Sequence, residues 1–138
     1  GLLRQVDLIT PNEVELQLLT GMPTDSPEAM VAAGRALLAR GVGQVIIKAG
    51  RQGAWLISGD EATHCPGFMV KAVDTTAAGD SFNAGLAAGL SEGRALRPAI
   101  TLANAVGALS TTGAGAQGAM PERAAVDAFL RDRGVDLG

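Results

Sequence analysis

The sequence predicts an α/β domain with a largely parallel sheet that is covered by helices on both faces. Short β-branched runs alternate with longer segments whose apolar residues recur at helical spacing. Hydrophobic residues make up 47% of the 138 residues and charged residues 18%, a composition that supports a packed core. The length fits one domain over 1–138 rather than two.

Capping residues and glycines predict two helices in the first third of the chain. Asn12 follows a short apolar strand and can cap a helix that Gly21 ends. Ser26 is the expected N-cap of a second helix, Pro27 suits its first position, and Gly41 ends it. In chain order, the expected elements are strand 6–9, helices 13–20 and 27–40, strands 45–47, 54–57 and 68–73, helices 77–93 and 96–109, and a last helix opened by Pro121.

The composition also excludes several classes of function. A single Cys and a single His allow neither an internal disulfide nor a zinc cluster. The net charge of -3, with one Trp, three Phe and no Tyr, argues against nucleic-acid binding. No apolar run has the ~20 residues of a membrane span and the first residues lack a signal-peptide pattern, so we expect no membrane partner and a cytoplasmic location.

The densest candidate site is a turn of small residues over 74–80, between a predicted strand and a predicted helix. A helix N-terminus has unpaired N–H groups and partial positive charge, and Ala77, Ala78 and Gly79 would let an anion approach. Asp80 in the first turn could accept a proton, which fits phosphoryl transfer to a hydroxyl. Asp80 could equally stabilise the helix with no ligand, and the residues alone do not decide.

Asn12 and Glu15 form a second candidate. Their spacing is that of a capping box, with Asn in place of Ser or Thr, and this structural interpretation is the favoured one. The alternative is an amide and a carboxylate at the end of a strand that hold water around Mg2+ near phosphates. Mg2+ keeps several of its waters and needs few protein carboxylates, so this pair would suffice.

Two glycine-containing segments are weaker candidates. The segment Lys48–Gly53 is expected to be the turn of a β-hairpin, and its alternative function is a nucleotide cradle in which Lys48 adds charge. Small residues near Asn104 could leave room for a flat ring, and carbonyls of the following glycine-rich loop could bind a monovalent cation, although a surface loop is the simpler interpretation. His64 and Cys65 are not expected to form a catalytic pair, because neighbours on a strand point to opposite faces.

Together and in this order, these motifs resemble the carboxyl-terminal half of ribokinase-like (PfkB-type) sugar kinases. The segment 10–15 resembles the family's N-x-x-E motif, and 48–53 resembles its nucleotide loop. The segment Asp74–Asp80 resembles the highly specific D-T-x-[GA]-A-G-D signature, and 115–121 is most similar to the ribokinase branch. The resemblance covers essentially all of 1–138 and implies that they are the ATP-binding and catalytic part of a three-layer α/β/α ribokinase-like domain.

The resemblance also implies an activity, cofactors and roles for residues. It implies ATP-dependent phosphorylation of a sugar hydroxyl, with Asp80 as general base and an anion hole formed by Ala77, Ala78 and Gly79. The implied cofactors are ATP, Mg2+ and a potassium-like ion. Residues implied to line the ATP site are Asn12, Lys48, Ala49, Gly50, Arg51, Gln52, Gly53, Gly79 and Asn104. Those implied at metal ions are Asn12 and Glu15 for Mg2+, and Asp74, Thr76, Ser110, Gly113 and Gly115 for the monovalent cation.

Two departures from the family pattern leave the sugar open. Ala119 stands where ribokinases often have Ser, which weakens one cation contact, and Ala77 replaces the commoner Gly, as in 2-keto-3-deoxygluconate kinases. The alternatives are therefore a 2-keto-3-deoxygluconate kinase, a fructokinase, or a nucleotide-binding fragment that does not turn over alone. A Rossmann-type oxidoreductase is disfavoured because no G-x-G-x-x-G follows the first strand.

The family's amino-terminal half, with its sugar-recognising residues and small β lid, is missing from this sequence. The resemblance therefore implies the ATP half of a site, and we expect the isolated chain to be inactive. The partners implied for the complete protein are ATP, a small sugar, and a second copy in a homodimer formed through the lid.

Overall fold

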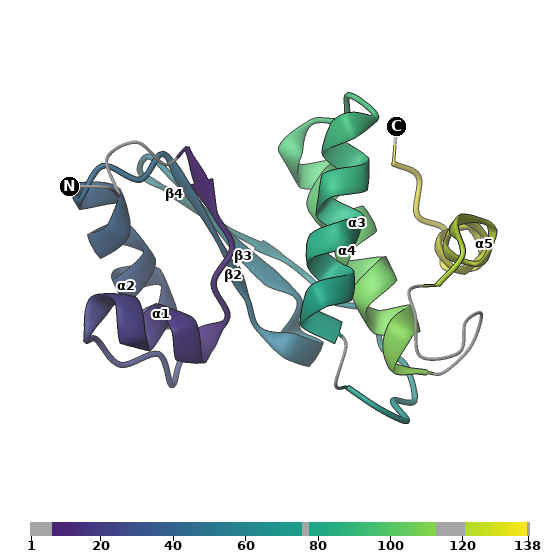
Figure 1. Ribbon diagram of the computed structural model, residues 1–138, viewed down its shortest axis with the longest axis horizontal. Coiled ribbons are helices and arrows are strands. Elements are labelled where there is room, and N and C mark those ends of the chain that lie inside the picture. The colour runs from purple at the N-terminus through teal and green to yellow at the C-terminus, as the bar shows by residue number, and fades with distance from the viewer. Residues whose placement is uncertain (1–6, 76–77, 113–120, 138) are drawn as a thin grey trace. The chain divides into compact units, whose positions relative to one another are not determined.

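The computed structural model describes residues 7–75, 78–112 and 121–137, and these fall into two compact units. The first unit comprises Gly1–Ala49 and Gly53–Cys65, and the second comprises Gly50–Gln52 and Pro66–Gly138. Figure 1 shows that the first unit contains the sheet and two helices and that the second is helical. Each unit is described by itself.

The sheet of the first unit has the strand order β1-β2-β3-β4. β1 (Leu8–Ile9) pairs in parallel with β2 (Gln44–Lys48), whereas β3 (Ala54–Ser58) and β4 (Glu61–Cys65) continue the sheet in antiparallel fashion. The α/β class is as expected, but the described sheet is mixed rather than largely parallel. The physical reason is the short connections after β2 and β3, which can join only antiparallel strands. Gly50 and Gly59 make these turns at φ values of 57° and 56°.

Two segments differ from the sequence-based prediction, because pairing with a neighbouring strand determines whether a segment forms a strand. No element was predicted over 61–65, and the structure has β4 there, a strand through its ladder with β3. The segment 68–73 has strand-like composition, yet the structure gives it no regular element. Among the described residues no strand lies beside it to supply a ladder.

Two helices cover one face of this sheet (Figure 1). α1 (Glu13–Thr20) ends at Gly21, which has the left-handed conformation, and α2 (Pro27–Ala39) is capped by the Ser26 hydroxyl, which accepts from the Ala29 N–H at 3.1 Å. Both caps are as predicted. The shared core is fully buried and includes Leu16, Leu37, Val45, Ile47 and Ile57.

α2 approaches the sheet closely at Gly34. A Cβ atom at this position would lie 2.9 Å from Cγ1 of Ile57 and 3.3 Å from Cδ1 of Ile47. Real Cβ atoms essentially never come within 3.0 Å of such an atom. Glycine is therefore required here by packing, although it costs helix propensity.

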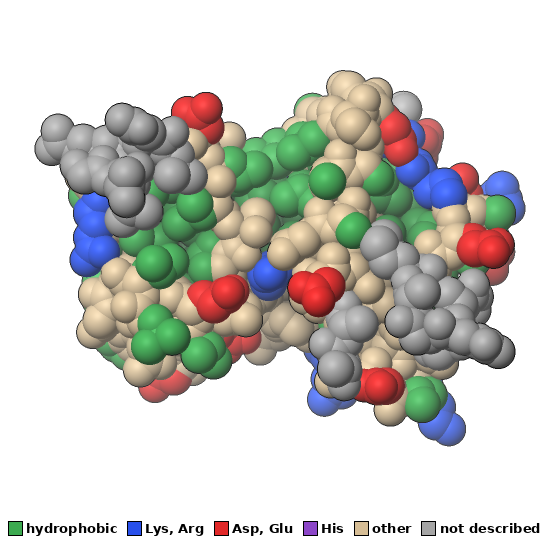
Figure 2. Space-filling view, viewed as in Figure 1, with side chains coloured by type: hydrophobic (Ala, Val, Ile, Leu, Met, Phe, Trp, Pro, Cys, Tyr) green, Lys and Arg blue, Asp and Glu red, His purple; other side chains and the backbone are tan. Residues whose placement is uncertain are grey.

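The opposite side of α1 carries apolar side chains at the surface. Val14 is 67% exposed and Leu18 80% exposed, and Figure 2 shows hydrophobic side chains over this helix at lower left. β1 has β2 as its partner and is the edge strand of the described sheet. Within the described residues, the outer face of α1 is therefore exposed, and the outer edge of β1 has no paired strand.

The second unit is built on two helices that lie side by side, α3 (Ala78–Ser91) and α4 (Leu96–Thr111) (Figure 1). A Cβ at Gly85 would lie 3.0 Å from the Cα of Ala103, and one at Gly89 would lie 3.0 Å from the Cα of Ala99. The third helix, α5 (Arg123–Asp132), packs its apolar face on α4. The core residues of this contact are Leu102, Ala105, Val106, Leu109, Val126, Phe129 and Leu130.

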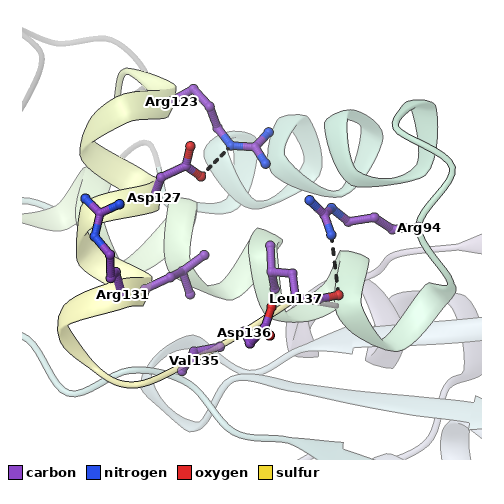
Figure 3. Close-up of a pocket in the computed structure, with 8 residues that line it drawn as sticks. Arg94, Arg123, Asp127, Arg131, Val135, Asp136 and Leu137 are labelled. Atoms are coloured by element: carbon purple, nitrogen blue, oxygen red, sulfur yellow. Dashed lines mark hydrogen bonds and ion pairs between the residues drawn. The ribbon is translucent and has the colours of Figure 1, made fainter.

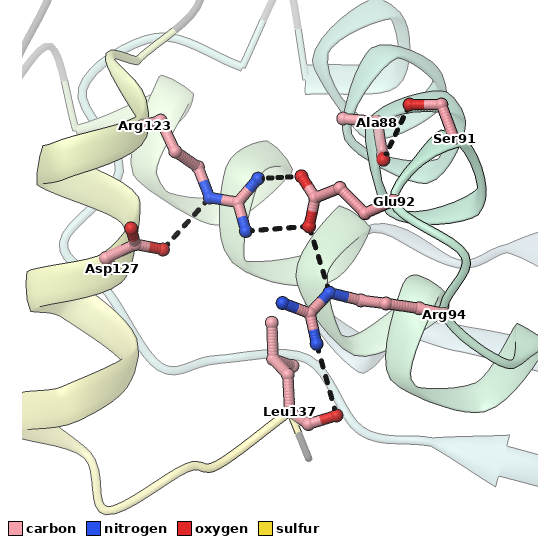
Figure 4. Close-up of polar contacts among 7 residues, drawn as sticks. All are labelled: Ala88, Ser91, Glu92, Arg94, Arg123, Asp127 and Leu137. Atoms are coloured by element: carbon pink, nitrogen blue, oxygen red, sulfur yellow. Dashed lines mark hydrogen bonds and ion pairs between the residues drawn. The ribbon is translucent and has the colours of Figure 1, made fainter.

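A network of ion pairs ties the end of α3 to α5 (Figure 4). Arg123 donates through both terminal nitrogens to the Glu92 carboxylate and through Nε to Asp127 at 2.9 Å. Arg94 donates from Nε to Glu92 at 3.0 Å and from Nη1 to the carbonyl of Leu137 at 3.3 Å. The hydrogen bonds from Arg123 and then Arg94 lower the pKa of Glu92 from 4.5 to about 2.

We predict that Gly34→Val lowers the free energy of unfolding by about 2 kcal/mol, because overpacking a filled core typically costs ~1–3 kcal/mol. Ala32→Val, on the exposed side of the same helix, is the matched control and should change it by less than ~1 kcal/mol. Urea unfolding followed by circular dichroism measures both values. Equal losses in the two variants would contradict the close approach at Gly34.

We predict that Glu92→Gln destabilises the chain near neutral pH and that this difference disappears in acid. A carboxyl group whose pKa is lowered on folding adds stability above its unfolded value, here 4.5, and loses it as the pH falls through the folded value of about 2. The free energies of unfolding of the unaltered chain and of Glu92→Gln, measured in steps from pH 7 downwards, should therefore converge as the pH falls from 4.5 to about 2. Asp132→Asn is the control, and a difference that stays constant into strong acid would refute the assignment.

Candidate functional site

In the first unit, the predicted site residues Asn12 and Lys48 are neighbours at the carboxyl ends of two parallel strands. They form a parallel β-bridge directly after the β1–β2 ladder, and the Lys48 N–H donates to the carbonyl of Pro11 at 2.9 Å. In α/β sheets, ligands bind outside the carboxyl ends of parallel strands. The pairing of these two segments therefore places the amide side chain of Asn12 and the ammonium group of Lys48 at the edge of the sheet where a ligand is expected.

Asn12 and Glu15 form the predicted capping box. Asn12 Oδ1 accepts from the Glu15 N–H at 2.8 Å, and Glu15 Oε1 accepts from the Asn12 N–H at 2.9 Å. The structural interpretation of this pair is thus confirmed. The box uses one oxygen of each exposed side chain, and neither the amide nitrogen of Asn12 nor the second oxygen of Glu15 is part of it. Capping and a role in metal hydration are therefore compatible.

The segment Lys48–Gly53 is a tight turn, as expected. Gly50–Gln52 form one turn of 3-10 helix, and the Ala49 N–H donates to the carbonyl of Gly53 at 2.9 Å. Gly53 has a φ of 92°, which favours glycine. The exposed residues 50–52 belong to the second unit, whereas the half-buried Lys48 belongs to the first.

In the second unit, the start of α3 carries the predicted catalytic residues. Ala78 is its first residue, and Asp80 lies exposed in its first turn. The Ala78 N–H donates to the carbonyl of Thr75 at 3.2 Å, so one predicted anion-binding amide already has a partner. Thr76 and Ala77, also predicted at the site, lie outside the described residues.

α4 packs against this start at another glycine. A Cβ at Gly107 would lie 3.4 Å from the carbonyl oxygen of Ala78. Asn104, about one turn earlier on the same helix, is only 6% exposed, and its Nδ2 donates to the carbonyl of Pro66 at 3.2 Å. The predicted ATP-site residue is thereby shown to hold the backbone of another segment.

The backbone of Asp74 lies beside the last turn of α4, which contains Ser110. The N–H groups of Val73 and Asp74 both donate to the carbonyl of Thr111, at 2.6 and 3.0 Å. The structure thus brings together two of the residues predicted at a monovalent cation. The other three, Thr76, Gly113 and Gly115, lie outside the described residues, as does Ala119.

Three contacts of this region were not predicted. The carbonyl of Thr111 and that of Pro66 act as acceptors, and Nη2 of Arg133 donates to the carbonyl of Met69, before α3, at 3.3 Å. The last four carbonyls of a helix lack intrahelical partners, and that signal could have pointed to Thr111. The other two join positions far apart in the sequence, and no local pattern marks them.

Other sequence expectations concern groups away from this region. Trp55 stacks on the exposed His64 at a centroid distance of 4.5 Å, while Cys65 is buried, so the two neighbours do point to opposite faces. Among residues 7–75, 78–112 and 121–137, no three His, Cys, Asp or Glu side chains gather as a metal-binding group. Nor does any helix in these ranges have the length and apolar character needed to cross a membrane.

Comparison with known proteins identifies the family. The family model described as "pfkB family carbohydrate kinase" matches residues 1–123. The chain belongs to this family. Ribokinase from Haemophilus influenzae is 37% identical over 129 residues, which are 94% of this chain and 42% of that protein. Deoxyribokinase from Salmonella typhi is 38% identical over 115 residues, which are 83% of this chain and 38% of that protein.

Solved structures of the family show the same fold. The Arabidopsis thaliana ribokinase complexed with ribose and ATP matches with a TM-score of 0.86 and 36% identity, over 94% of this chain and 42% of that one. A putative ribokinase II from E. coli in complex with ATP and Mg2+ matches with a TM-score of 0.78 and 34% identity, over 95% and 41%. The expected ribokinase-like fold is confirmed, and the chain spans about two fifths of the length of these relatives.

We predict that Asn12→Ala lowers the free energy of unfolding by about 1 kcal/mol, because it removes the acceptor for the Glu15 N–H. Asn12→Asp keeps an acceptor at the same place and should stay within ~0.5 kcal/mol of the unchanged chain. Chemical denaturation of the three proteins measures this. Similar stability of the Ala and Asp variants would show that the capping hydrogen bond contributes nothing.

Proposed function

We propose that the chain is the nucleotide-binding and catalytic part, over 1–138, of an enzyme that transfers a phosphoryl group from ATP to a sugar hydroxyl. The observation that carries this proposal is the position of Asp80 in the first turn of α3, at the end of the signature 74–80. Membership of the pfkB family and the similarity to proteins named ribokinase and deoxyribokinase support the reaction class.

Asp80 is proposed as the general base. As the sugar oxygen forms its bond to the γ-phosphorus of ATP, the bond from that phosphorus to the β–γ bridging oxygen breaks and ADP leaves. The hydroxyl proton passes to the Asp80 carboxylate, which is exposed and can be reached by a substrate. Backbone N–H groups of Ala77, Ala78 and Gly79 would meet the transferring phosphoryl group, whose negative charge the N-terminus of α3 favours.

The ATP-site residues are proposed on the same basis. Lys48 would add positive charge near the phosphates, and the tight turn after it would allow close approach of the backbone. Asn104 and the small residues around it would line the base. The full proposed set is Asn12, Lys48, Ala49, Gly50, Arg51, Gln52, Gly53, Gly79 and Asn104.

Two cations are proposed with the nucleotide. At the end of β1, Glu15 has a carboxylate oxygen outside the capping box, and Asn12 Oδ1 has a second lone pair; Mg2+ prefers oxygen ligands and keeps several waters. Bound Mg2+ would offset the charge of the ATP phosphates, and a relative's structure holds ATP with Mg2+. For a monovalent cation we propose Asp74, Thr76 and carbonyls around Ser110, Gly113 and Gly115.

The sugar, the location and the assembly are also proposals. The names of relatives favour a ribose-like sugar as substrate. Fructose is an alternative, because a fructokinase from Vibrio cholerae is 36% identical. 2-Keto-3-deoxygluconate is another alternative, because Ala77 resembles the residue in kinases of that sugar. We propose a cytoplasmic enzyme whose complete form dimerises through a lid. The second candidate function is a nucleotide-binding fragment that does not turn over alone.

We predict that Asp80→Asn lowers kcat of the complete gene product by about 10²–10⁴-fold, the usual contribution of a positioned base. The affinity for ATP should change little, because Asn fits the helix start and adds no repulsion. Steady-state kinetics at saturating sugar, with calorimetry of an ATP analogue, measures both quantities.

Asp74→Asn is the matched control, and it should alter dependence on K+ or stability more than kcat. Near-unchanged kcat in Asp80→Asn would leave this carboxylate only a helix-stabilising role. The unaltered gene product should also be assayed with ribose, deoxyribose, fructose and 2-keto-3-deoxygluconate. If it binds ATP but phosphorylates none of these sugars, the second candidate function, nucleotide binding without turnover, is favoured.

A further inference from the structure

Residues 66–75, here called the strap, join β4 to the start of α3 without forming a regular element. Their two ends are fixed to the same helix. Near the first end, Asn104 of α4 donates to the carbonyl of Pro66 at 3.2 Å. Near the second, the N–H groups of Val73 and Asp74 donate to the carbonyl of Thr111 at 2.6 and 3.0 Å. The rigid body of α4 therefore sets where the strap begins and where it ends.

The middle of the strap is held by α5. The ring of Phe68 meets that of Phe129 edge-on, with the centroids 5.3 Å apart. The guanidinium of Arg133 lies 3.7 Å from the centroid of the Phe129 ring, and its Nη2 donates to the carbonyl of Met69 at 3.3 Å. The Arg133 side chain therefore contacts both the Phe129 ring, which packs on Phe68, and the backbone of Met69. A planar guanidinium can do both at once.

Apart from these contacts, the strap is supported by Phe68 and Val70, which pack partly buried against the core of α4 and α5. Met69 is 84% exposed and Val73 is 75% exposed, so these two side chains contribute almost no burial. A segment with few buried apolar contacts opens at low cost, and its position then depends on the hydrogen bonds and ring contacts that remain.

The far end of the strap leads into the proposed catalytic turn. The carbonyl of Thr75 accepts from the N–H of Ala78, the first residue of α3, at 3.2 Å. Asp80 lies two residues further along this helix. A shift of the strap is therefore transmitted to the start of α3 through a direct hydrogen bond.

We propose that Arg133 is a positioning residue for phosphoryl transfer: by holding Met69 it fixes the strap, and through the strap it fixes the start of α3 and the Asp80 carboxylate. This inference rests on the proposed function of Asp80. A displacement of ~1 Å at reacting groups can cost up to ~10²-fold in rate. Since Arg133 is one of several anchors, its loss should cost about two- to tenfold in kcat.

The test compares Arg133→Gln with Arg131→Gln. Both remove one positive charge at the end of α5, but Arg131 lines a cavity of about 390 Å3 with Asp127 and Val135 (Figure 3). Hydrogen–deuterium exchange at the Val73 and Asp74 amides should become about two- to fivefold faster in Arg133→Gln, as expected for an exposed cation–π contact. It should not change in Arg131→Gln. Thermal unfolding of both variants verifies that they are folded.

Kinetics of the complete gene product give the second readout. Arg133→Gln should lower kcat while KM for ATP stays within about twofold, and Arg133→Lys should restore part of kcat because a cation returns over Phe129. Unchanged exchange at Val73 and Asp74, or faster exchange with unchanged kcat, would overturn the inference while leaving Asp80 as the base. An unaltered gene product that phosphorylates no sugar would instead overturn the proposed function, and the exchange rates would still report whether Arg133 holds the strap.

Discussion

The second unit depends on the close contact between the backbones of α3 and α4. Gly85 and Gly89 lie where any Cβ atom would stand 3.0 Å from a Cα atom of the other helix. This spacing fixes the start of α3 relative to Gly107, and it fixes Thr111 relative to the residues before α3. The proposed base Asp80, the proposed cation ligand Ser110 and Asn104 are all carried by these two helices. Larger side chains at the two glycines would therefore disturb the proposed site without touching any of its residues.

Helix ends carry much of the proposed chemistry, and they also have structural duties. The Asn12–Glu15 box satisfies two N–H groups at the start of α1, and the Thr75 carbonyl satisfies that of Ala78 at the start of α3. A capping pattern in a sequence is consequently weak evidence against a ligand role. The two roles can be separated only by asking which atoms the cap uses, and in the box one polar atom of each side chain remains outside it.

Local signals predicted the helices well and the strands less well. Ser26 with Pro27, and Asn12 with Gly21, mark helix ends through bonds to nearby backbone, so their pattern is visible in the sequence. β4 exists because β3 is beside it, and 68–73 lacks such a neighbour among the described residues. The same distinction holds for the site. Asp80 was placed correctly in a first turn, whereas the contact of Arg133 with Met69 joins positions 64 residues apart and leaves no local signal.

The hydrogen bond between Ala78 and Thr75 bears on how an anion would enter the proposed site. With no ligand, the Ala78 N–H is bonded to a neutral carbonyl, so the turn is not left with an unsatisfied donor there. Hydrogen bonds to charged acceptors are roughly twice as strong as those between neutral groups. A phosphoryl oxygen could share this N–H with the Thr75 carbonyl in a three-centre hydrogen bond, an arrangement common at helix termini, and the strap would then stay connected to α3. Binding of the transferring group and the position of the strap would for this reason be coupled through one backbone N–H group.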